Sequence, residues 1–414
     1  MGKNIQISLE TMLRCGGNCS GCALSSLERM SKSSIDWGFL KEKVSSVHGF
    51  LKEKSLTTEI ESIGLFLGQG DHFLMSEDEM HKYMEYCSKM IPKELMHKTV
   101  TFITASAIGK EKNIKEKMDK FFEISLLYKM PFFIQVVFDP KKMSLTDKFK
   151  STYINNIMYF KSKCGMTEVT LNLGNDMLTM TPKEFHQWVL EYGFTHVEMN
   201  WVMNNQTSSM WEKYSESMFS WLKELLIINA SDHKYEINFI PFLARAFALK
   251  GIDNANLIKE IGNSLEENIY IDSIGNVSLA QSGLVSNLTP LLQRLEKQNL
   301  TTKNINEINI FSNKSSKNIM SKLLRKKFCV DCDFNYVCAQ IGSTAWFDFE
   351  KQNGNNCPWN IKDFLSFISD YLVTFPNLGK TKFDKNPIQD SVLSVKNNET
   401  FHYFEKKFKK IDNT

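Results

Sequence analysis

The chain has 414 residues, of which 42% are hydrophobic, so it is long enough for a large α/β domain and a second, smaller domain. Its 50 Lys and Arg residues nearly balance 47 Asp and Glu residues, and the net charge of +3 gives no reason to expect nucleic acid or a membrane as the main partner. No apolar signal stretch opens the chain, which predicts a cytoplasmic protein whose clustered cysteines bind metal rather than form disulfides.

Short β-type runs alternate with amphipathic helical patterns over the first 240 residues. Strands are predicted at residues 4–9, 62–67, 99–104, 132–138, 168–173, 196–201 and 235–240. Helices are predicted at residues 77–90, 113–128, 145–162, 181–192 and 209–228. This repetition predicts an α/β fold in which a parallel sheet curls into a complete or partial barrel, with the active site at the C-terminal ends of the strands.

Three cysteines follow the first predicted strand, in the run CGGNCSGC. Cys15, Cys19 and Cys22 have the spacing C-x3-C-x2-C, with no fourth cysteine nearby. Iron-sulfur cubanes are normally held by four thiolates, so a site with three leaves one iron open to a substrate or cofactor. The triplet therefore predicts a catalytic iron-sulfur centre.

This motif, in this place, resembles that of the radical S-adenosylmethionine enzymes, which carry it after the first strand of a partial (β/α)6 barrel. The resemblance implies a [4Fe–4S] cluster, bound S-adenosylmethionine, and its reductive cleavage to a 5'-deoxyadenosyl radical that takes hydrogen from a substrate carbon. It also implies a flavodoxin- or ferredoxin-type electron donor. One departure is Gly21, which stands where the family usually has an aromatic residue before the third cysteine.

The resemblance extends to the ends of the later strands. After the second strand the family has a Gly-Gly-Glu turn for the amino group of S-adenosylmethionine, and Gly70 and Asp71 stand in the matching place. Polar residues at the next three strand ends are implied as further cofactor contacts. They are Thr104, Ser106, Gln135, Asp139 and Asn172. Each of these residue types also caps strand ends in ordinary folds.

A second group of four cysteines lies near the other end, with the spacing C-x2-C-x5-C and a later fourth member. The four are Cys329, Cys332, Cys338 and Cys357. Four thiolates suit either zinc or a closed cubane, and spacing does not separate the two. The pattern resembles an auxiliary cluster of the SPASM domain, which implies a second [4Fe–4S] cluster that handles electrons.

A hairpin predicted at residues 268–283 resembles the start of the same domain but lacks its cysteine. We therefore expect a shortened SPASM domain with one auxiliary cluster, a β-hairpin and helices. The resulting division is a barrel at 1–235, the iron-sulfur domain at 236–375 and an extension at 376–414. The two other cysteines, Cys87 and Cys164, lie within helical patterns and are expected to be buried.

The substrate is predicted less sharply than the cofactor. The SPASM resemblance implies oxidative modification of a ribosomally made peptide, with dehydrogenation or epimerisation of a sugar or aminocyclitol as the alternative. A non-catalytic zinc-binding scaffold is a third interpretation. Candidate substrate residues are Glu198, Arg245 and Tyr270, although Glu198 also suits a hydrogen bond at the core edge and Arg245 a buried ion pair.

The segment from His402 to Ile411 predicts a basic amphipathic helix, with Phe404 and Phe408 on its apolar stripe. Such a helix packs on its own domain or docks an acidic partner.

Overall fold

The structure is a computed structural model of the whole chain, and part of it is described. The described residues are 3–9, 14–22, 29–30, 37–68, 70–166, 168–201, 207–248, 268–271, 276–278, 298–299, 332–334, 337, 357, 361–376, 378, 404 and 406–410.

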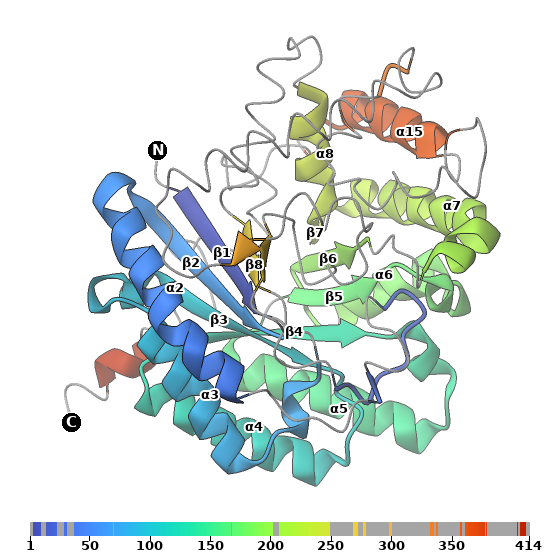
Figure 1. The fold of residues 1–414 in the computed structure, drawn as a ribbon. Helices are drawn as coiled ribbons and strands as arrows, with labels where there is room; N and C mark the ends of the chain where they lie inside the picture. The colour runs from blue at the N-terminus through green and yellow to red at the C-terminus, as the bar shows by residue number, and fades with distance from the viewer. Residues whose placement is uncertain are drawn as a thin grey trace.

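A parallel sheet forms the centre of the molecule (Figure 1). Each strand from β1 to β6 pairs in parallel with the strand that follows it in the chain, so that seven strands are joined in sequence order. The strands are β1 (Lys3–Leu9), β2 (Ile60–Leu67), β3 (Thr99–Ala105), β4 (Phe132–Phe138), β5 (Glu168–Asn172), β6 (His196–Asn200) and β7 (Glu236–Ile237). Their carboxyl ends therefore lie along one edge, which is where parallel α/β sheets hold ligands.

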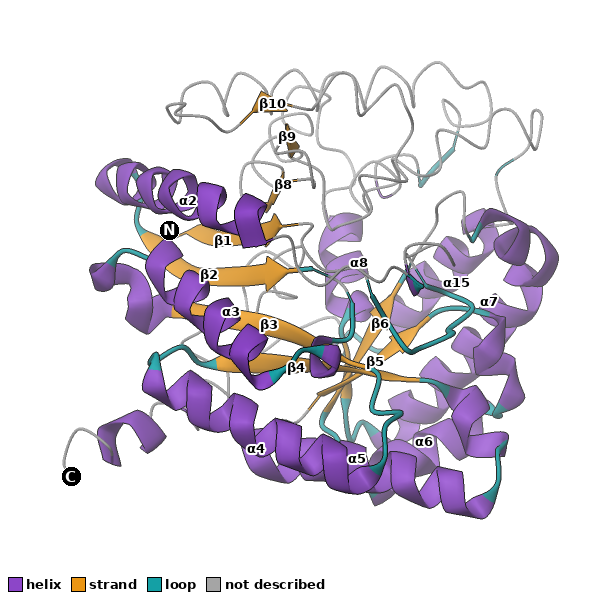
Figure 2. Ribbon diagram, turned by 60° about the horizontal axis from the view of Figure 1, so that its bottom comes forward, coloured by secondary structure: helices purple, strands orange, loops and turns teal. Residues whose placement is uncertain are grey.

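Helices connect successive strands and cover one face of the curled sheet (Figure 2). The α-helices are α2 (Trp37–Thr57), α3 (Glu77–Met90), α4 (Glu111–Leu127), α5 (Asp147–Cys164), α6 (Pro182–Glu191), α7 (Ser208–Asp232) and α8 (Phe239–Ala248). Short 3-10 turns lie between several of these elements. They are η1 (His72–Leu74), η2 (Lys93–Lys98), η3 (Pro140–Ser144) and η4 (Asn175–Thr179).

A hairpin extends the sheet beyond β1. Its strands β8 (Asn268–Ile271) and β9 (Asn276–Ser278) are antiparallel to one another, and β8 runs parallel to β1. The short strand β10 (Gln298–Asn299) pairs with β9. The predicted hairpin strands are thus confirmed and join the barrel's own sheet, whereas its turn lies outside the described residues.

The two faces of the strands differ in burial. In β1, Ile5, Ile7 and Leu9 point to the helices and are fully buried, while Gln6 faces the opposite side and is half-buried. The same alternation continues in β6, where every second residue is half-buried, and in the second half of β4, where Gln135 and Val137 are half-buried. The main core therefore lies between sheet and helices, and solvent reaches part of the inner face of the barrel.

The sequence patterns located the barrel elements within a few residues. The helix predicted at 77–90 is α3, and its start is fixed by a capping box between Ser76 and Glu79. The strand predicted at 235–240 is shorter than expected, because the apolar residues after β7 begin α8. The helix α2 was not predicted. The α/β partial-barrel fold itself is confirmed.

Two helices from the C-terminal part pack on the barrel. The helix α15 (Ile361–Thr374) places Phe364 against Trp201 and Phe219, with ring centroids 5.5 and 4.7 Å away. Phe404, from the predicted basic helix, is fully buried, and its ring centroid lies 5.0 Å from that of Phe132 in β4. That segment therefore packs on its own chain, as one of the two interpretations expected.

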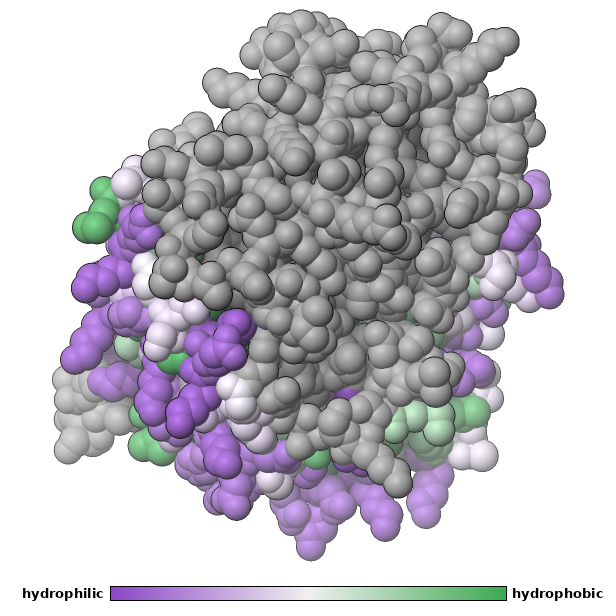
Figure 3. Space-filling view, in the orientation of Figure 1, coloured by the Kyte–Doolittle hydropathy of each residue, from purple (hydrophilic) through white to green (hydrophobic). Residues whose placement is uncertain are grey.

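Polar residues cover much of the outer surface that is described. On the face drawn in Figure 3, hydrophilic side chains follow the lower edge, over α4 and α5. Among the described residues, no helix is both long enough and apolar enough to cross a membrane.

Replacing Phe138 by alanine tests the core between β4 and α6. The ring is 1% exposed and stacks on Trp188 at 4.0 Å. We expect Phe138→Ala to lower the free energy of unfolding by about 3–5 kcal/mol, because it removes aromatic contacts and leaves a cavity. Urea unfolding measures the change. The control is Leu127→Ala, on a side chain 67% exposed, which should stay within about 0.5 kcal/mol of the wild type.

Candidate functional site

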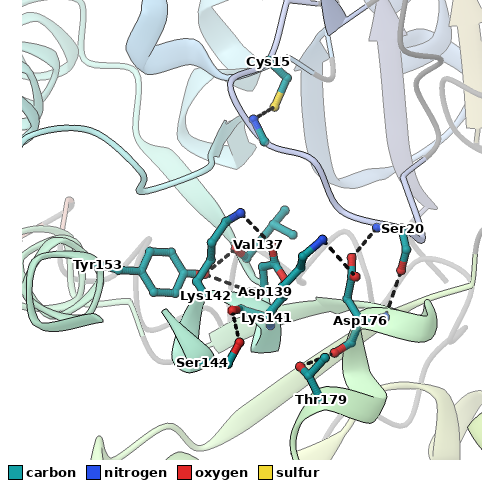
Figure 4. A network of polar contacts seen from close by, with 11 residues as sticks. Cys15, Ser20, Val137, Asp139, Lys141, Lys142, Ser144, Tyr153, Asp176 and Thr179 are labelled. Carbon is teal, nitrogen blue, oxygen red and sulfur yellow. Dashed lines mark hydrogen bonds and ion pairs between the residues drawn. The ribbon is translucent and has the colours of Figure 1, made fainter. Parts of the chain in front are cut away.

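The three cysteines lie on a loop that follows β1, at the edge where the parallel strands end. Figure 4 shows Cys15 and Ser20 on this loop. The loop has no regular secondary structure over residues 14–22. All three cysteines are half-buried, and none of them is in a disulfide. The side chains of Cys15 and Cys19 approach the same point, because their Sγ atoms lie 3.3 and 3.9 Å from the position that a Cβ on Gly17 would take.

This arrangement fits a metal cluster. Burial raises the pKa of Cys15 to about 11 and also raises the pKa of Cys19. The charge of Cys22 acts on Cys15, and the charges of Cys22 and Cys15 both act on Cys19. A cysteine thiol loses its proton and becomes a thiolate when it binds metal. The absence of a side chain on Gly17 leaves open the space beside the sulfurs. Within the described residues, no three His, Cys, Asp or Glu side chains surround a single point as ligands of one ion would; in a cubane, each cysteine binds a different iron.

Backbone contacts hold the cysteine loop on two sides. On one side, the Asp71 N–H donates to the Arg14 carbonyl at 2.8 Å. On the other, the Ser20 N–H donates to Asp176 Oδ2 at 2.6 Å, and the Asp176 N–H donates to Ser20 Oγ at 3.0 Å. The loop is therefore fixed to the turns that follow β2 and β5.

Gly21 is buried against the turn after β5. A Cβ on Gly21 would lie under 3.0 Å from the Leu173 carbonyl, a separation that real Cβ atoms essentially never show. A Cβ on Gly174 would meet Ser20 Oγ and the Gly21 nitrogen as closely. The Leu173–Gly174 backbone thus occupies the space of any side chain at position 21, which explains why an aromatic residue does not stand before Cys22.

The turn after β2 carries Gly70 and Asp71, and Asp71 contacts Ser106 in the turn after β3. The Asp71 carboxylate accepts hydrogen bonds from the Phe73 N–H at 3.0 Å and from the Ser106 hydroxyl. Burial raises the pKa of Asp71, and these two hydrogen bonds oppose the rise. Gly70 is buried beside it. Ser106 therefore supports Asp71, and its hydroxyl proton is already used.

His72 links this turn to the end of β3. Its imidazole is fully buried, and Nδ1 accepts the Thr104 N–H at 3.0 Å. Burial lowers the pKa of His72 to about 4, so the ring is neutral at physiological pH. The Thr104 side chain itself stays half-buried on the inner face.

At the end of β4, Asp139 is bound to its own turn. Its Oδ1 accepts the Lys141 N–H at 3.1 Å and its Oδ2 lies 3.3 Å from Lys142 Nζ. The Asp139 N–H donates to the Tyr153 hydroxyl at 2.9 Å (Figure 4). Asp139 contributes negative charge beside Cys19, since it is the largest charged influence on that thiol.

Polar side chains of β4, β5 and β6 meet inside the barrel. Glu198 accepts hydrogen bonds from Gln135 Nε2 and Thr170 Oγ1, both at 2.8 Å. Burial and the Glu198 carboxyl, with which Glu168 also makes a hydrogen bond, raise the pKa of Glu168 well above its usual range. Asn172 is joined to the neighbouring β6 through a 3.2 Å hydrogen bond from Asn200.

An aromatic wall lies beside these polar groups on the inner surface, on the adjacent strands β2, β3 and β4. Phe66 and Phe102 stack with centroids 4.1 Å apart, and Phe133 lies 5.5 Å from Phe102. The register places all three on the inner face, beside Gln6 and Ser8 of β1. The interior thus has one apolar side and one side rich in carboxyl and amide groups.

The remaining candidates are described in part. Cys357 lies close enough to Cys332 for the latter to influence its pKa, which burial raises; Cys329 and Cys338 lie outside the described residues. Arg245 belongs to α8, and Tyr270 of β8 pairs with Ser8 of β1. Cys87 and Cys164 are fully buried in α3 and α5, as expected.

Sequence patterns missed the residues that position the site. Ser20 and Asp176 are 156 positions apart, and a pairing over this separation leaves no local signal. Glu168 and Glu198 are recognisable as a pair only from the register of β5 and β6. His72 has one sequence signal, which is its place directly after the turn that follows β2.

Comparison with known proteins gives matches in structure. No protein-family model matches the chain, and no curated protein matches its sequence.

The solved structures it resembles include anSMEcpe with bound AdoMet, at 13% identity and a TM-score of 0.56, over 90% of this chain and 98% of that one. The same protein with AdoMet and the Cp18Cys peptide matches at 14% identity and a TM-score of 0.55, over 90% of this chain and 97% of that one. SuiB of Streptococcus suis, bound to the precursor peptide SuiA, matches at 12% identity and a TM-score of 0.52, over 87% of this chain and 76% of that one. These matches show a shared fold.

Adding a methyl group at Gly21 tests the contact between the cysteine loop and the turn after β5. We expect Gly21→Ala to destabilise the protein by about 1–3 kcal/mol, because the Leu173 backbone must move. The matched control is Gly49→Ala in α2, where nothing lies within 4 Å of the new Cβ. That substitution should stabilise the protein by about 0.5–1 kcal/mol. Equal behaviour of the two variants in urea unfolding would contradict the tight contact.

Replacing Glu168 by glutamine tests the carboxyl pair inside the barrel. Glu168 has a raised pKa in the folded protein, so the folded state binds more protons than the unfolded state above about pH 4.3. The wild type should therefore lose stability as pH rises from that value towards the folded pKa. We expect Glu168→Gln to remove this loss, and to be more stable than the wild type at pH 8 but not at pH 4. Thermal unfolding of both proteins across this pH range measures the difference. If the two carboxyl groups were not coupled, the variant and the wild type would show the same dependence of stability on pH.

Proposed function

We propose that this chain is a radical S-adenosylmethionine enzyme, in which Cys15, Cys19 and Cys22 hold a [4Fe–4S] cluster with one open iron. The observation that carries the proposal is the approach of these three thiols to one another at the strand-end edge of a partial barrel. The fold shared with AdoMet-bound structures supports it. When bound and reduced, this cofactor pair supplies a 5'-deoxyadenosyl radical able to take hydrogen from an unactivated carbon.

The residues after β2 are proposed to receive the amino group of S-adenosylmethionine. The Asp71 carboxylate accepts hydrogen bonds from the Phe73 N–H and from the hydroxyl and the backbone N–H of Ser106. An ionised carboxylate has about four acceptor positions, so it retains capacity for an ammonium group. An ammonium beside it would also offset the burial that raises its pKa. Gly70 lets the backbone approach closely, and Ser106 fixes the carboxylate.

The other residues proposed to contact the cofactor differ in whether their side chains are exposed on the inner face or already engaged by neighbouring residues. Thr104, Gln135 and Asn172 are half-buried on the inner face, which suits contact with a bound cofactor. Asp139 already interacts with Lys142 and is nearly fully buried. Its role is therefore proposed to be the positioning of the turn after β4, with only an indirect effect on the cofactor.

We infer that the substrate enters the barrel, between the aromatic wall and the Glu198 group. Phe66 and Phe102 would exclude water from a reactive radical, while Gln135 and Glu198 offer hydrogen-bond partners. Two of the similar structures contain peptides, Cp18Cys and SuiA, which supports a peptide substrate. The proposed chemistry is oxidative modification of that peptide, with Glu198, Arg245 and Tyr270 as substrate contacts in a cytoplasmic enzyme.

The C-terminal cysteines are proposed to hold a second [4Fe–4S] cluster that passes electrons. The nearness of Cys332 and Cys357, 25 positions apart in sequence, supports a shared site. A flavodoxin- or ferredoxin-type protein would supply the electron for each cleavage of S-adenosylmethionine.

Iron analysis of anaerobically reconstituted protein tests both clusters. We expect about eight irons and matching labile sulfide per chain, since two cubanes hold four irons each. Under a strong reductant, the protein should convert S-adenosylmethionine to 5'-deoxyadenosine. Cys15→Ala should lose about half of the iron and all of this product, because the radical site then has only two thiolates.

Cys87→Ala is the matched control, since Cys87 is a fully buried thiol of α3 away from the loop. It should keep its iron and its product. A protein that binds one zinc and little sulfide would instead support the scaffold interpretation. A protein that is fully loaded but yields no 5'-deoxyadenosine would overturn the radical mechanism.

A further inference from the structure

The reciprocal hydrogen bonds between Ser20 and Asp176 join two loops that are distant in sequence. The Ser20 N–H and hydroxyl oxygen both contact Asp176, at 2.6 and 3.0 Å (Figure 4). A backbone N–H bound to a carboxylate is a charge-assisted hydrogen bond, about twice as strong as a neutral one. Ser20 lies directly after Cys19 and two residues before Cys22. The pair therefore acts on the half of the loop that carries these two cysteines.

The same half of the loop is held by close backbone packing. Gly21 contacts Leu173 and Gly174 so tightly that neither glycine has space for a Cβ. Cys22 adds a turn of its own, since its N–H donates to the Cys19 carbonyl at 3.2 Å. Cys15 is held by different contacts, because its N–H donates to the Arg29 carbonyl at 3.2 Å and its Sγ accepts the Gly17 N–H at 3.3 Å.

Asp176 is itself well fixed. It is 9% exposed, and its Oδ1 lies 4.0 Å from Lys141 Nζ. The Thr179 hydroxyl donates to the Asp176 carbonyl at 2.7 Å, within η4. However, the Asp176 carboxylate also disfavours ionisation of Cys19, whose pKa it helps to raise. Its contribution to the site is thus better explained by geometry than by charge.

We propose that Ser20 and Asp176 are positioning residues that hold Cys19 and Cys22 in place for iron before the cluster is assembled. The identity of the metal rests on the proposed function, whereas the fixing of the loop does not. Without the pair, the loop between Cys15 and Cys22 would open locally more often, and its two later thiols would be presented to iron less of the time.

The test uses the full-length, metal-free protein and the rate at which iodoacetamide alkylates each cysteine, resolved by peptide mass spectrometry. We expect Ser20→Ala to speed the alkylation of Cys19 and Cys22 roughly fivefold or more, as the loss of one hydrogen bond shifts a local opening equilibrium. Cys15 should keep its rate. Cluster assembly at limiting iron should slow, while the final iron content stays unchanged.

Three comparisons separate positioning from other effects. Asp176→Asn removes the charge but keeps an oxygen that accepts the Ser20 N–H. Its Cys19 and Cys22 should therefore be alkylated more slowly than those of Asp176→Ala. Ser144→Ala is the matched control, because its hydroxyl donates to the Lys141 carbonyl at 2.8 Å within η3 and does not touch the loop. It should match the wild type. The rates of the buried Cys87 and Cys164 report global unfolding.

The proposal is overturned if Ser20→Ala and Asp176→Ala both keep wild-type rates at Cys19 and Cys22. It is also overturned if all cysteines, buried ones included, speed up equally. A selective change without any cleavage of S-adenosylmethionine by the loaded wild type would leave the positioning role standing and refute the proposed function.

Discussion

Parallel pairing from β1 to β7 is the constraint on which the rest of this structure depends. Because each strand pairs with its successor in the same direction, every loop after a strand emerges at one edge of the sheet. The cysteine loop, the Asp71 turn and the Asp176 turn are far apart in sequence but meet there. The loop that carries the thiols has no regular structure of its own, so its shape is set by these neighbours.

Alternation along the strands divides the protein into two chemical environments. The outer faces carry aliphatic and aromatic residues that bind the helices, which gives rigidity to the scaffold. The inner faces carry Gln135, Thr170 and Glu198 as well as three phenylalanines, Phe66, Phe102 and Phe133. Such a lining combines water exclusion with directional hydrogen bonding, both of which suit the reaction proposed above.

Local patterns predicted the barrel well, since strand alternation and helix caps such as Ser76 are encoded within a few residues. They failed where structure depends on distant partners. The apolar run after β7 looked like strand but forms α8, because periodicity in a short apolar stretch does not distinguish the two. The cysteines of the site were identifiable from spacing, whereas Ser20, Asp176 and Glu168 gain their meaning only from the register of the sheet.

The pairing of β8 with β1 has a consequence for the order in which the chain is made. Among the described strands, β1 is synthesised before the others, yet its second neighbour, β8, follows only after the βα units from β2 to β7. Until then, one side of β1 presents unpaired backbone groups, which are a template for association with other chains. Folding on the ribosome would therefore leave the edge beside the cysteine loop incomplete until β8 has been made, and a chaperone or a bound partner that covers this edge would favour correct assembly.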